Sequence, residues 1–278
     1  MRIDLCGVRG SMPAAGPAFA GVGGNTSCVA VTHDASSVPT LVIDGGTGLR
    51  NVEGLLGEAP FRGTLILSHL HWDHTQGLPF FTGADRLGSR VHVRLPVASG
   101  SPSHALDPLM APPFFPITPA GLAGDWTFAA VDEGRFEVER FEVLAREVPH
   151  QGGRTFGFRV TDGHSSLAYL SDHGPIVLGP GPDGWGPYHD AARELAQGVD
   201  VLLHDAQYTA SELAEKPNFG HSAVDYAVEL AERCGVGRLV MFHHDPWRTD
   251  DDVEAIVRRF SGGPLKVDAA IEGQTIVL

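Results

Sequence analysis

The segment Ser68–His74 brings four side chains that can bind metal into six residues. They are His69, His71, Asp73 and His74. Imidazole nitrogens and carboxylate oxygens together suit zinc, manganese or iron. Residues two apart in an extended chain project to the same side, so the first two histidines could share one ion while the other pair turns toward a second. The alternative, a histidine-rich surface turn, does not account for four ligand types at the end of an apolar run.

Histidines and aspartates also follow other apolar, strand-like runs. The positions are Asp44, His69, His150, Asp172, His204, Asp205 and His243. Ligands of layered α/β folds bind outside the carboxyl ends of strands, so these side chains are expected to converge on one cleft. Two roles stay open for Asp44: a hydrogen bond to a metal-bound histidine, or a cap on the turn that follows it.

The run from His69 to His74 resembles the H-x-H-x-D-H signature of the metallo-β-lactamase superfamily. The resemblance extends from Gly7 to about Asp252. It implies an α/β fold, an αββα four-layer sandwich in which two mixed β-sheets face each other with helices outside. The length of 278 residues is within reach of one large α/β domain, so a single domain over residues 1–278 is expected.

The same resemblance implies metal ligands beyond the motif. His150, Asp172 and His243 fall where that fold supplies its third histidine, its bridging aspartate and its final histidine. The expected ligand sets are His69, His71 and His150 for one ion, Asp73, His74 and His243 for the other, with Asp172 bridging both. His244 competes with His243, which is preferred because it lies nearest the strand end. Zinc is the expected metal, with manganese or iron as alternatives.

Two later segments narrow the choice within the superfamily. Leu203–Tyr208 resembles the H-E-A-x-[FY] segment of its phosphodiesterase branch, which includes tRNase Z and PhnP-type cyclic phosphodiesterases, and Gly220–Ala223 resembles the G-H-S-T segment. By this resemblance His221 would be the general acid, and Asp205 would fix its tautomer and raise its pKa. Asp73 is expected to serve catalysis as well as metal binding. The alternative for His221 is a helix cap without a catalytic role.

The chain also departs from that branch. Its S-G-D-T segment is Ser171–Gly174 here, which leaves His173 either touching substrate or facing solvent. The acid in the H-E-A position is the shorter Asp205, and residues 151–171 are too few for the tRNA-gripping arm that tRNase Z bears there in cis. The three cysteines form no C-x-x-C pair, so neither a cysteine zinc site nor a disulfide framework is indicated.

Composition restricts the partners. The net charge of −14, with no basic stripe, argues against long nucleic acid, because phosphate neutralisation drives that binding. A small phosphoester is compatible with this acidity, since bound cations reverse the local field. No apolar run approaches the ~20 residues that cross a bilayer. The start lacks a signal-peptide pattern, so a cytoplasmic protein without a membrane partner is expected. A homodimer is implied only by the resemblance.

Residues and resemblance together predict a hydrolase with two divalent metal ions. The expected substrate is a small phosphodiester, such as a cyclic nucleotide or cyclic sugar phosphate. A hydroxide bridging the metals would attack phosphorus, and His221 would protonate the leaving oxygen. Three alternatives stay open: a tRNA 3′-processing endoribonuclease, a thioester or lactone hydrolase, and a metal-stabilised nucleotide-binding protein without catalysis.

Periodicity and turn residues predict the elements that position these groups. Strands are expected over residues 2–8, 28–32, 41–43, 64–68, 136–149 (one or two strands), 156–160, 167–170, 199–203, 238–242 and 269–278. Helices are expected over 191–197 with Asp190 as N-cap, from a capping-box-like Ser222–Asp225 to Cys234, and over 252–260.

Two loops rich in glycine or proline are each open to two interpretations. Residues 9–27 either bind an anion, with Arg9 adding a bidentate contact, or form a plain hairpin connection. Residues 99–124 carry six prolines, which forbid a long helix or central strand. Such a long loop is usually functional, and a lid over the metal cleft is favoured over packing on the far side of the core.

Overall fold

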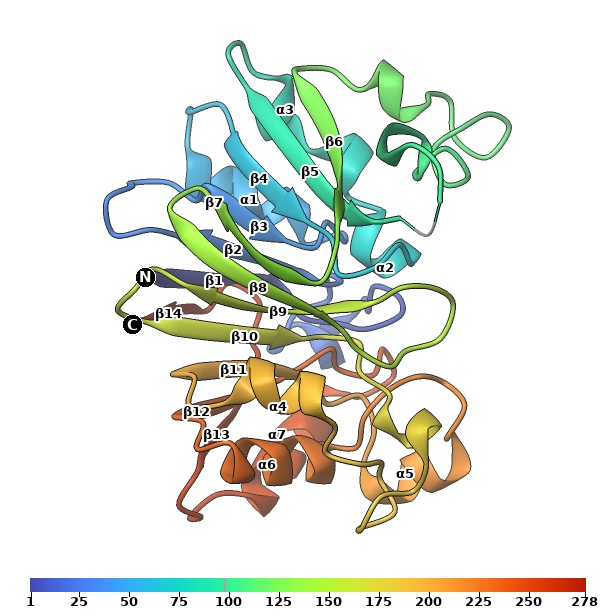
Figure 1. The fold of residues 1–278 in the computed structure, drawn as a ribbon, viewed down its shortest axis with the longest axis vertical. Helices are drawn as coiled ribbons and strands as arrows, with labels where there is room; N and C mark the ends of the chain where they lie inside the picture. The colour runs from blue at the N-terminus through green and yellow to red at the C-terminus, as the bar shows by residue number, and fades with distance from the viewer. Residues whose placement is uncertain (98) are drawn as a thin grey trace.

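Two seven-stranded β-sheets face each other in the computed structural model, which describes residues 1–97 and 99–278 (Figure 1). The first sheet contains β1 (Arg2–Gly7), β2 (Cys28–Thr32), β3 (Leu41–Ile43), β4 (Arg62–Ile66), β5 (Arg90–Pro96), β6 (Trp126–Val131) and β14 (Thr275–Val277). The second contains β7 (Gly134–Val138), β8 (Phe141–Glu147), β9 (Phe156–Thr161), β10 (Ser166–Leu170), β11 (Val201–Asp205), β12 (Arg238–Phe242) and β13 (Lys266–Ala269).

Both sheets are mixed. Their orders are β14-β1-β2-β3-β4-β5-β6 and β13-β12-β11-β10-β9-β8-β7. Strands β3 to β6 are parallel to one another, as are β10 to β13. The remaining neighbours in each sheet pair antiparallel. Parallel strands end at one edge of a sheet, so each sheet delivers several strand ends to the same side.

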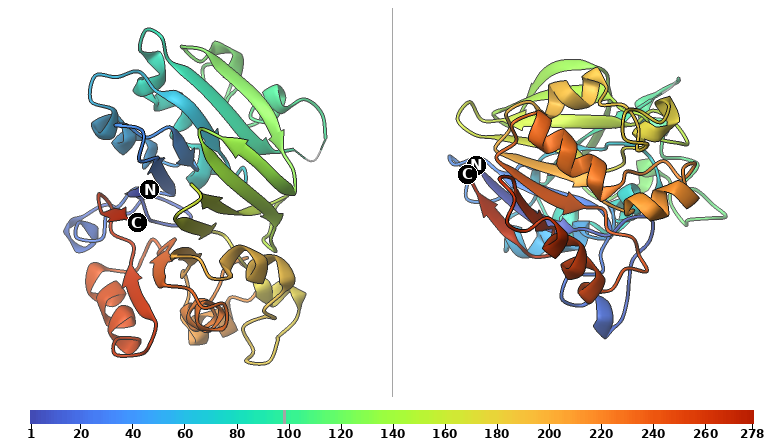
Figure 2. Two further views of the ribbon diagram at one scale, coloured as in Figure 1. Left: turned by 60° about the vertical axis from the view of Figure 1, so that its left-hand side comes forward. Right: turned by 90° about the horizontal axis from the view of Figure 1, so that it is seen from below.

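Helices cover the outer faces of the sheets (Figures 1 and 2). The helices of the described residues are α1 (Leu49–Leu56), α2 (Trp72–Thr75), α3 (Thr82–Asp85), α4 (Asp190–Ala196), α5 (Ala210–Glu215), α6 (Val224–Arg233) and α7 (Asp250–Arg259). Short 3₁₀ turns are η1 (Pro17–Phe19), η2 (Leu78–Phe80), η3 (Pro102–His104), η4 (Pro119–Gly121) and η5 (Pro175–Leu178). Helix α1 packs on the first sheet, and α4, α6 and α7 pack on the second. The predicted αββα sandwich is therefore confirmed.

Strand β10 illustrates why these strands are apolar at nearly every position. Leu167 and Tyr169 face the core between the sheets, whereas Ala168 and Leu170 face the core beneath the helices. Successive side chains of a strand point to opposite faces, so a strand covered on both sides is apolar throughout. Because the strand interiors are apolar and buried, the polar residues at the strand ends are the ones available to form a site.

Several predicted boundaries are corrected. The segment 269–278 holds the final strand as expected, but β14 covers only Thr275–Val277, and β13 (Lys266–Ala269) lies before it in the other sheet. The capping box at Ser222 is wrong, because α6 begins at Val224 and the Ser222 hydroxyl donates to the carbonyl of His173. Asp190 is the first residue of α4 rather than its N-cap. The segment 136–149 contains the two strands β7 and β8.

The chain ends lie side by side at one edge of the first sheet (Figures 1 and 2). The amide of Leu278 donates to the carbonyl of Met1 at 2.9 Å, in line with the antiparallel pairing of β1 and β14. The three cysteines are buried and free in the described residues. No helix within 1–97 and 99–278 is long and apolar enough to cross a membrane.

Candidate metal centre

The ends of β3, β4, β10, β11 and β12 surround one site between the sheets. Strand β4 leads through Ser68 into α2, whose single turn directs Asp73 and His74 inward. The glycine pair after Asp44 lets this turn pack closely, because a Cβ on Gly46 would collide with the carbonyl of Asp73. The Asp-Gly-Gly sequence after β3 is thus part of the support for α2.

Four side chains form the first candidate ligand set: His69, His71, His150 and Asp172. Oδ2 of Asp172 lies 3.6 Å from Nε2 of His69 and 3.5 Å from Nε2 of His150. Nδ1 of His71 lies 3.3 Å from Nε2 of His150. The other nitrogen of His150 donates to the carbonyl of Gly220 at 2.6 Å, which leaves Nε2 free to bind a cation.

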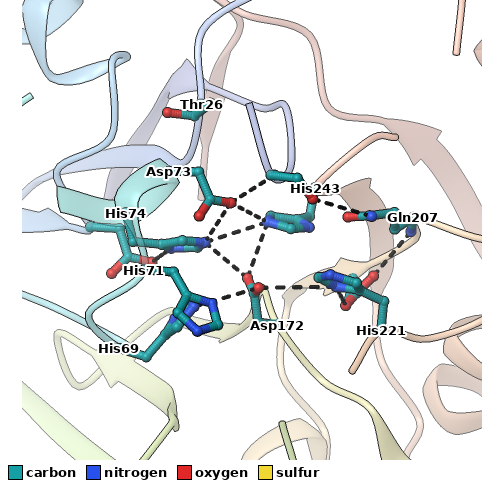
Figure 3. A network of polar contacts seen from close by, with 12 residues as sticks. Thr26, His69, His71, Asp73, His74, Asp172, Gln207, His221 and His243 are labelled. Carbon is teal, nitrogen blue, oxygen red and sulfur yellow. Dashed lines mark hydrogen bonds and ion pairs between the residues drawn. The ribbon is translucent and has the colours of Figure 1, made fainter. Parts of the chain in front are cut away.

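The second set consists of Asp73, His74, Asp172 and His243. Nε2 of His74 lies 3.3 Å from Oδ2 of Asp73 and 3.0 Å from Oδ1 of Asp172. Nε2 of His243 lies 3.2 Å from each of the same two carboxylate oxygens. Asp172 therefore directs one oxygen to each set, between His74, His243 and His221 in Figure 3. The structure brings together all seven residues that the sequence analysis assigned to metal binding.

The spacing of these atoms fits metal coordination. Ligand atoms 2.0–2.2 Å from one tetrahedral ion lie roughly 3.3–3.6 Å apart, and the contacts above span 3.0–3.6 Å. Nε2 of His69 is buried without a hydrogen-bond partner among the described residues. Buried polar atoms without a partner are rare in folded proteins, and a cation would satisfy this one. The donor set of imidazoles and carboxylates suits two divalent ions.

The electrostatics favour the metal-binding protonation state at His69 and Asp172 but not at His74. Burial lowers the pKa of His69 well below its ordinary value, and His74 lowers it further. Burial alone would raise the pKa of Asp172, but His243, His74 and His69 outweigh it and hold that pKa well below its usual range. Burial would lower the pKa of His74, but the nearby carboxylates, led by Asp172, outweigh burial and raise that pKa well above its ordinary value. A cation that binds His74 must therefore displace a proton.

A different pair of residues lies next to this centre. Nδ1 of His221 is 2.9 Å from Oδ2 of Asp205 and 4.0 Å from Oδ2 of Asp172. Asp205 is held in turn by the backbone amides of Gln207 and His173. Burial lowers the pKa of His221, but the charge of Asp205 and its hydrogen bond outweigh this, and the net direction is upward. Helix α6 is capped by Ala223, so His221 is not its cap.

The family described as Beta-lactamase superfamily domain matches residues 41–244, more than half of the chain. The chain belongs to the metallo-β-lactamase fold superfamily. Uncharacterized protein Rv1339 of Mycobacterium tuberculosis is 28% identical over 279 residues, covering 95% of this chain and 88% of that protein. Ribonuclease Z of Geobacillus kaustophilus is 25% identical over 217 residues, covering 64% and 69%.

Solved structures share the fold of this superfamily member. A diphosphatase from the PhnP family matches with a TM-score of 0.69 at 20% identity, over 100% of this chain and 97% of the other. The ribonuclease and diphosphatase relatives support a hydrolase, and the fold implies divalent metal ions. The two ligand sets of this metallo-β-lactamase-fold protein could hold such ions.

Asp44 is a hydrogen-bond partner of a candidate ligand, which resolves its two possible roles. Its Oδ2 accepts from Nδ1 of His74 at 2.7 Å and from the hydroxyl of Tyr169 at 2.7 Å. Its Oδ1 accepts from the amide of Ser68 at 2.6 Å. Sequence reasoning missed Tyr169 and Ser68. The hydroxyl of Tyr169, in an otherwise apolar strand that the sequence places beside the site, was the available signal.

We expect Asp44→Asn to lower the affinity for metal about 10- to 100-fold, because Nδ1 of His74 loses its charged acceptor. Asparagine tolerates the left-handed backbone of this position, where φ is 61°. Chelator competition on the metal-loaded protein measures the change. Tyr169→Phe is the matched control, with a smaller loss, since it removes only one donor to Asp44. An unchanged affinity in Asp44→Asn would refute the orienting role.

The two neighbouring histidines after β12 take separate positions. His243 joins the second ligand set, with a left-handed φ of 58° that turns its ring inward. His244 instead contacts the carbonyl of Ala270 through Nε2 at 3.0 Å, and burial lowers its pKa to about 3. A Cβ on Gly10 would collide with the ring of His243, so the close approach requires glycine there. The geometry supports the choice of His243.

His173 and His204 depart from expectation. His173 is fully buried, so it neither faces solvent nor touches the metal cavity. Its Nδ1 lies 3.0 Å from Nε2 of His204, and its Nε2 lies 2.7 Å from Nε2 of His189. His204 does not converge on the cleft, because neighbours in a strand point to opposite faces and Asp205 takes the inner one. The contacts among His204, His173 and His189 support the segment that carries Asp205, on the side away from the metal cavity.

The structure also bears on the two interpretations given for each of the loops 9–27 and 99–124. Arg9 binds no anion from solvent, because it is buried and donates to the carbonyls of Gly23 and Arg248 at 2.7 Å. The amide of Ser11 in the same loop donates to Oδ2 of Asp73 at 2.7 Å. From the proline-rich segment 99–124, Leu109 lines the cavity over the metal centre, as expected of a lid.

Proposed function

We propose that this chain is a phosphodiesterase that hydrolyses a small phosphodiester, with His221 as general acid. The observation that carries the proposal is the 2.9 Å contact between His221 and Asp205 in the wall of the cavity that also exposes Asp73 and Asp172. Asp205 occupies Nδ1 of His221, so Nε2 is the nitrogen that can donate to a leaving oxygen. The raised pKa keeps that proton available near neutral pH.

The other residues hold the reacting groups in place. Bound at the two sets, the ions would lower the pKa of a water and neutralise charge on the phosphoryl oxygens. His69, His71 and His150 would hold one ion, Asp73, His74 and His243 would hold the other, and Asp172 could contribute an oxygen to each. Asp44 orients His74, and the Ser11 amide orients Asp73. Zinc is the metal we expect, with manganese or iron as alternatives for this donor set.

The relatives support the same reaction class. One is named ribonuclease Z, and a structural neighbour is described as a diphosphatase. Both names denote cleavage at phosphorus. The cavity over the metal centre has a volume of about 420 Å³, which suits a small ligand. With a net charge of −14, the chain is a poor match for the polyanionic substrate of a ribonuclease.

A turnover assay with metal measured on the same sample tests this function. Metal-loaded protein is incubated with bis-p-nitrophenyl phosphate, a thioester and a lactone. We expect cleavage of the phosphodiester alone, in proportion to the fraction of chains that hold two ions, and its loss on chelation. Turnover of the thioester or lactone without phosphodiester cleavage would refute the proposal and leave Asp205 and His221 without a catalytic explanation.

A further inference from the structure

A second and larger cavity opens beside the metal centre. Its volume is about 620 Å³, and it shares Trp72 and Leu109 with the cavity that contains Asp73, Asp172 and His221. Because two side chains belong to both walls, the cavities are neighbours with a common border. A ligand whose phosphate sits at the metals could therefore extend into the second cavity.

The walls of this second cavity are apolar and aromatic. Phe80 and Phe115 meet edge to face with ring centroids 5.9 Å apart, and Phe114 also lines the cavity. Trp72 and Phe80 are 73% and 62% exposed, which is unusual for side chains of this size. No lysine, arginine, aspartate or glutamate is among the described residues that line it. The occupant is thus expected to be uncharged.

Local structure explains why these rings face the cavity. Asp73 and His74 point inward from α2, which leaves Trp72 on the outer side of the same turn. The turn η2 then exposes Phe80 while it buries Leu78. The lid segment 99–124 supplies the opposite wall. On this rim, Gln76 adds an exposed amide that can both donate and accept hydrogen bonds.

The position of the second cavity relative to His221 indicates which of the two arms of a phosphodiester could enter it. Trp72 lies between His71 and Asp73 in sequence, whereas His221 approaches from the other side of Asp172 (Figure 3). The leaving oxygen must be near His221 to receive its proton. The arm that stays on phosphorus does not need this proton, so it could extend past Trp72 into the second cavity.

We propose that the second cavity binds a flat, uncharged aromatic group, such as a nucleobase, on the arm of the phosphodiester that remains bonded to phosphorus. This inference rests on the proposed phosphodiesterase function. Aromatic walls favour a flat ring over an alkyl chain because rings gain from stacked and edge-to-face contacts. Bases stack on such side chains without a requirement for one sequence.

Two esters with the same leaving group test the proposal. Thymidine 5′-(p-nitrophenyl phosphate) and methyl p-nitrophenyl phosphate both release p-nitrophenolate, so only the retained arm differs. We expect kcat/KM to favour the thymidine ester about 5- to 100-fold, mainly through KM. Phe80→Ala should remove most of this preference and leave the methyl ester unchanged. Trp72→Ala should also reduce the preference, but because Trp72 lines the cavity over the metal centre as well, its effect on the methyl ester is measured alongside. Phe80→Leu, which keeps apolar area but no ring, should recover only part of the preference.

Trp247→Ala is the matched control, because Trp247 is 77% exposed and lines neither cavity. Equal kcat/KM for the two esters would overturn the proposal. An equal loss of kcat/KM for both esters in Phe80→Ala would also overturn it. So would a change of oligomeric state in Phe80→Ala, measured by light scattering, because a second copy of the chain would then cover the cavity. Metal content is measured for each variant, because Trp72 adjoins candidate ligands.

If neither ester is cleaved, the proposed function fails and the cavity is tested by itself. Calorimetric titration of metal-loaded protein with thymidine 5′-methylphosphonate then provides the readout. Binding that Phe80→Ala weakens about 5- to 100-fold would support the aromatic site without the activity. Absence of binding, or equal binding by Phe80→Ala, would overturn the aromatic site as well.

Discussion

Replacing His221 with alanine is expected to lower kcat about 10²- to 10⁴-fold for a phosphodiester with an alkoxide leaving group. Metal content should stay at the wild-type level, because His221 belongs to neither of the two four-residue ligand sets and forms only a three-residue group with Asp205 and His243. An alkoxide is a poor leaving group that needs a proton, whereas p-nitrophenolate departs readily without one. The loss should therefore be much smaller for p-nitrophenyl esters. Initial rates on both ester types, with metal analysis, measure this difference.

Asp205→Asn provides a second readout. Burial lowers the pKa of His221 and Asp205 raises it, so removing the carboxylate charge moves that pKa downward. A general acid works only while protonated, so the alkaline limb of the kcat profile should shift to lower pH in this variant. His164→Ala, at an exposed hairpin turn, is the control. Equal losses on both ester types, or a loss explained by missing metal, would contradict the role of His221.

Replacing Asp172 with asparagine is expected to reduce the metal content from two ions per chain to one or none. Its carboxylate directs Oδ1 to one ligand set and Oδ2 to the other, and an amide cannot offer two anionic oxygens. Activity should fall more than about 100-fold, the upper range for residues that only support ligands. Elemental analysis after dialysis gives the metal stoichiometry.

Thermal unfolding tests the same assignment without an activity assay. A ligand that binds only the folded state at 100 times its Kd adds about 2.7 kcal/mol of stability. Zinc should therefore raise the Tm of the wild type and have a much smaller effect on Asp172→Asn. Asp132→Asn, an exposed carboxylate that pairs with Arg154, should behave like the wild type. Two ions per chain in Asp172→Asn would refute the bridging role.

Part of the site was predictable because it is local in sequence. His69, His71, Asp73 and His74 come from one strand end and one helical turn, so their spacing alone brings them together. The strands around them were predictable from apolar runs. Other elements were missed despite visible signals. Strand β5 alternates buried and partly buried residues, and α5 begins with a capping box of Thr209 and Glu212.

Long-range pairing limited the prediction at the end of the chain. The segment 269–278 was expected to hold the final strand, and β14 lies within it, but β13 before it was not predicted. Strand β14 then pairs with β1 at the other end of the chain, and β13 pairs with β12. No local pattern contains this information, because both partners lie far away in sequence.

By itself, the sequence determined the apolar layers, the strand ends that carry histidine or aspartate, and the metal-binding character of the site. Tertiary structure decided which side chain of each neighbouring pair enters it. His243 rather than His244, and Asp205 rather than His204, face the centre. It also buried Arg9 and His173 and placed an aromatic cavity beside Trp72. The physical reason is that spacing specifies residue types along a strand, whereas strand pairing and backbone turns set the face each side chain meets.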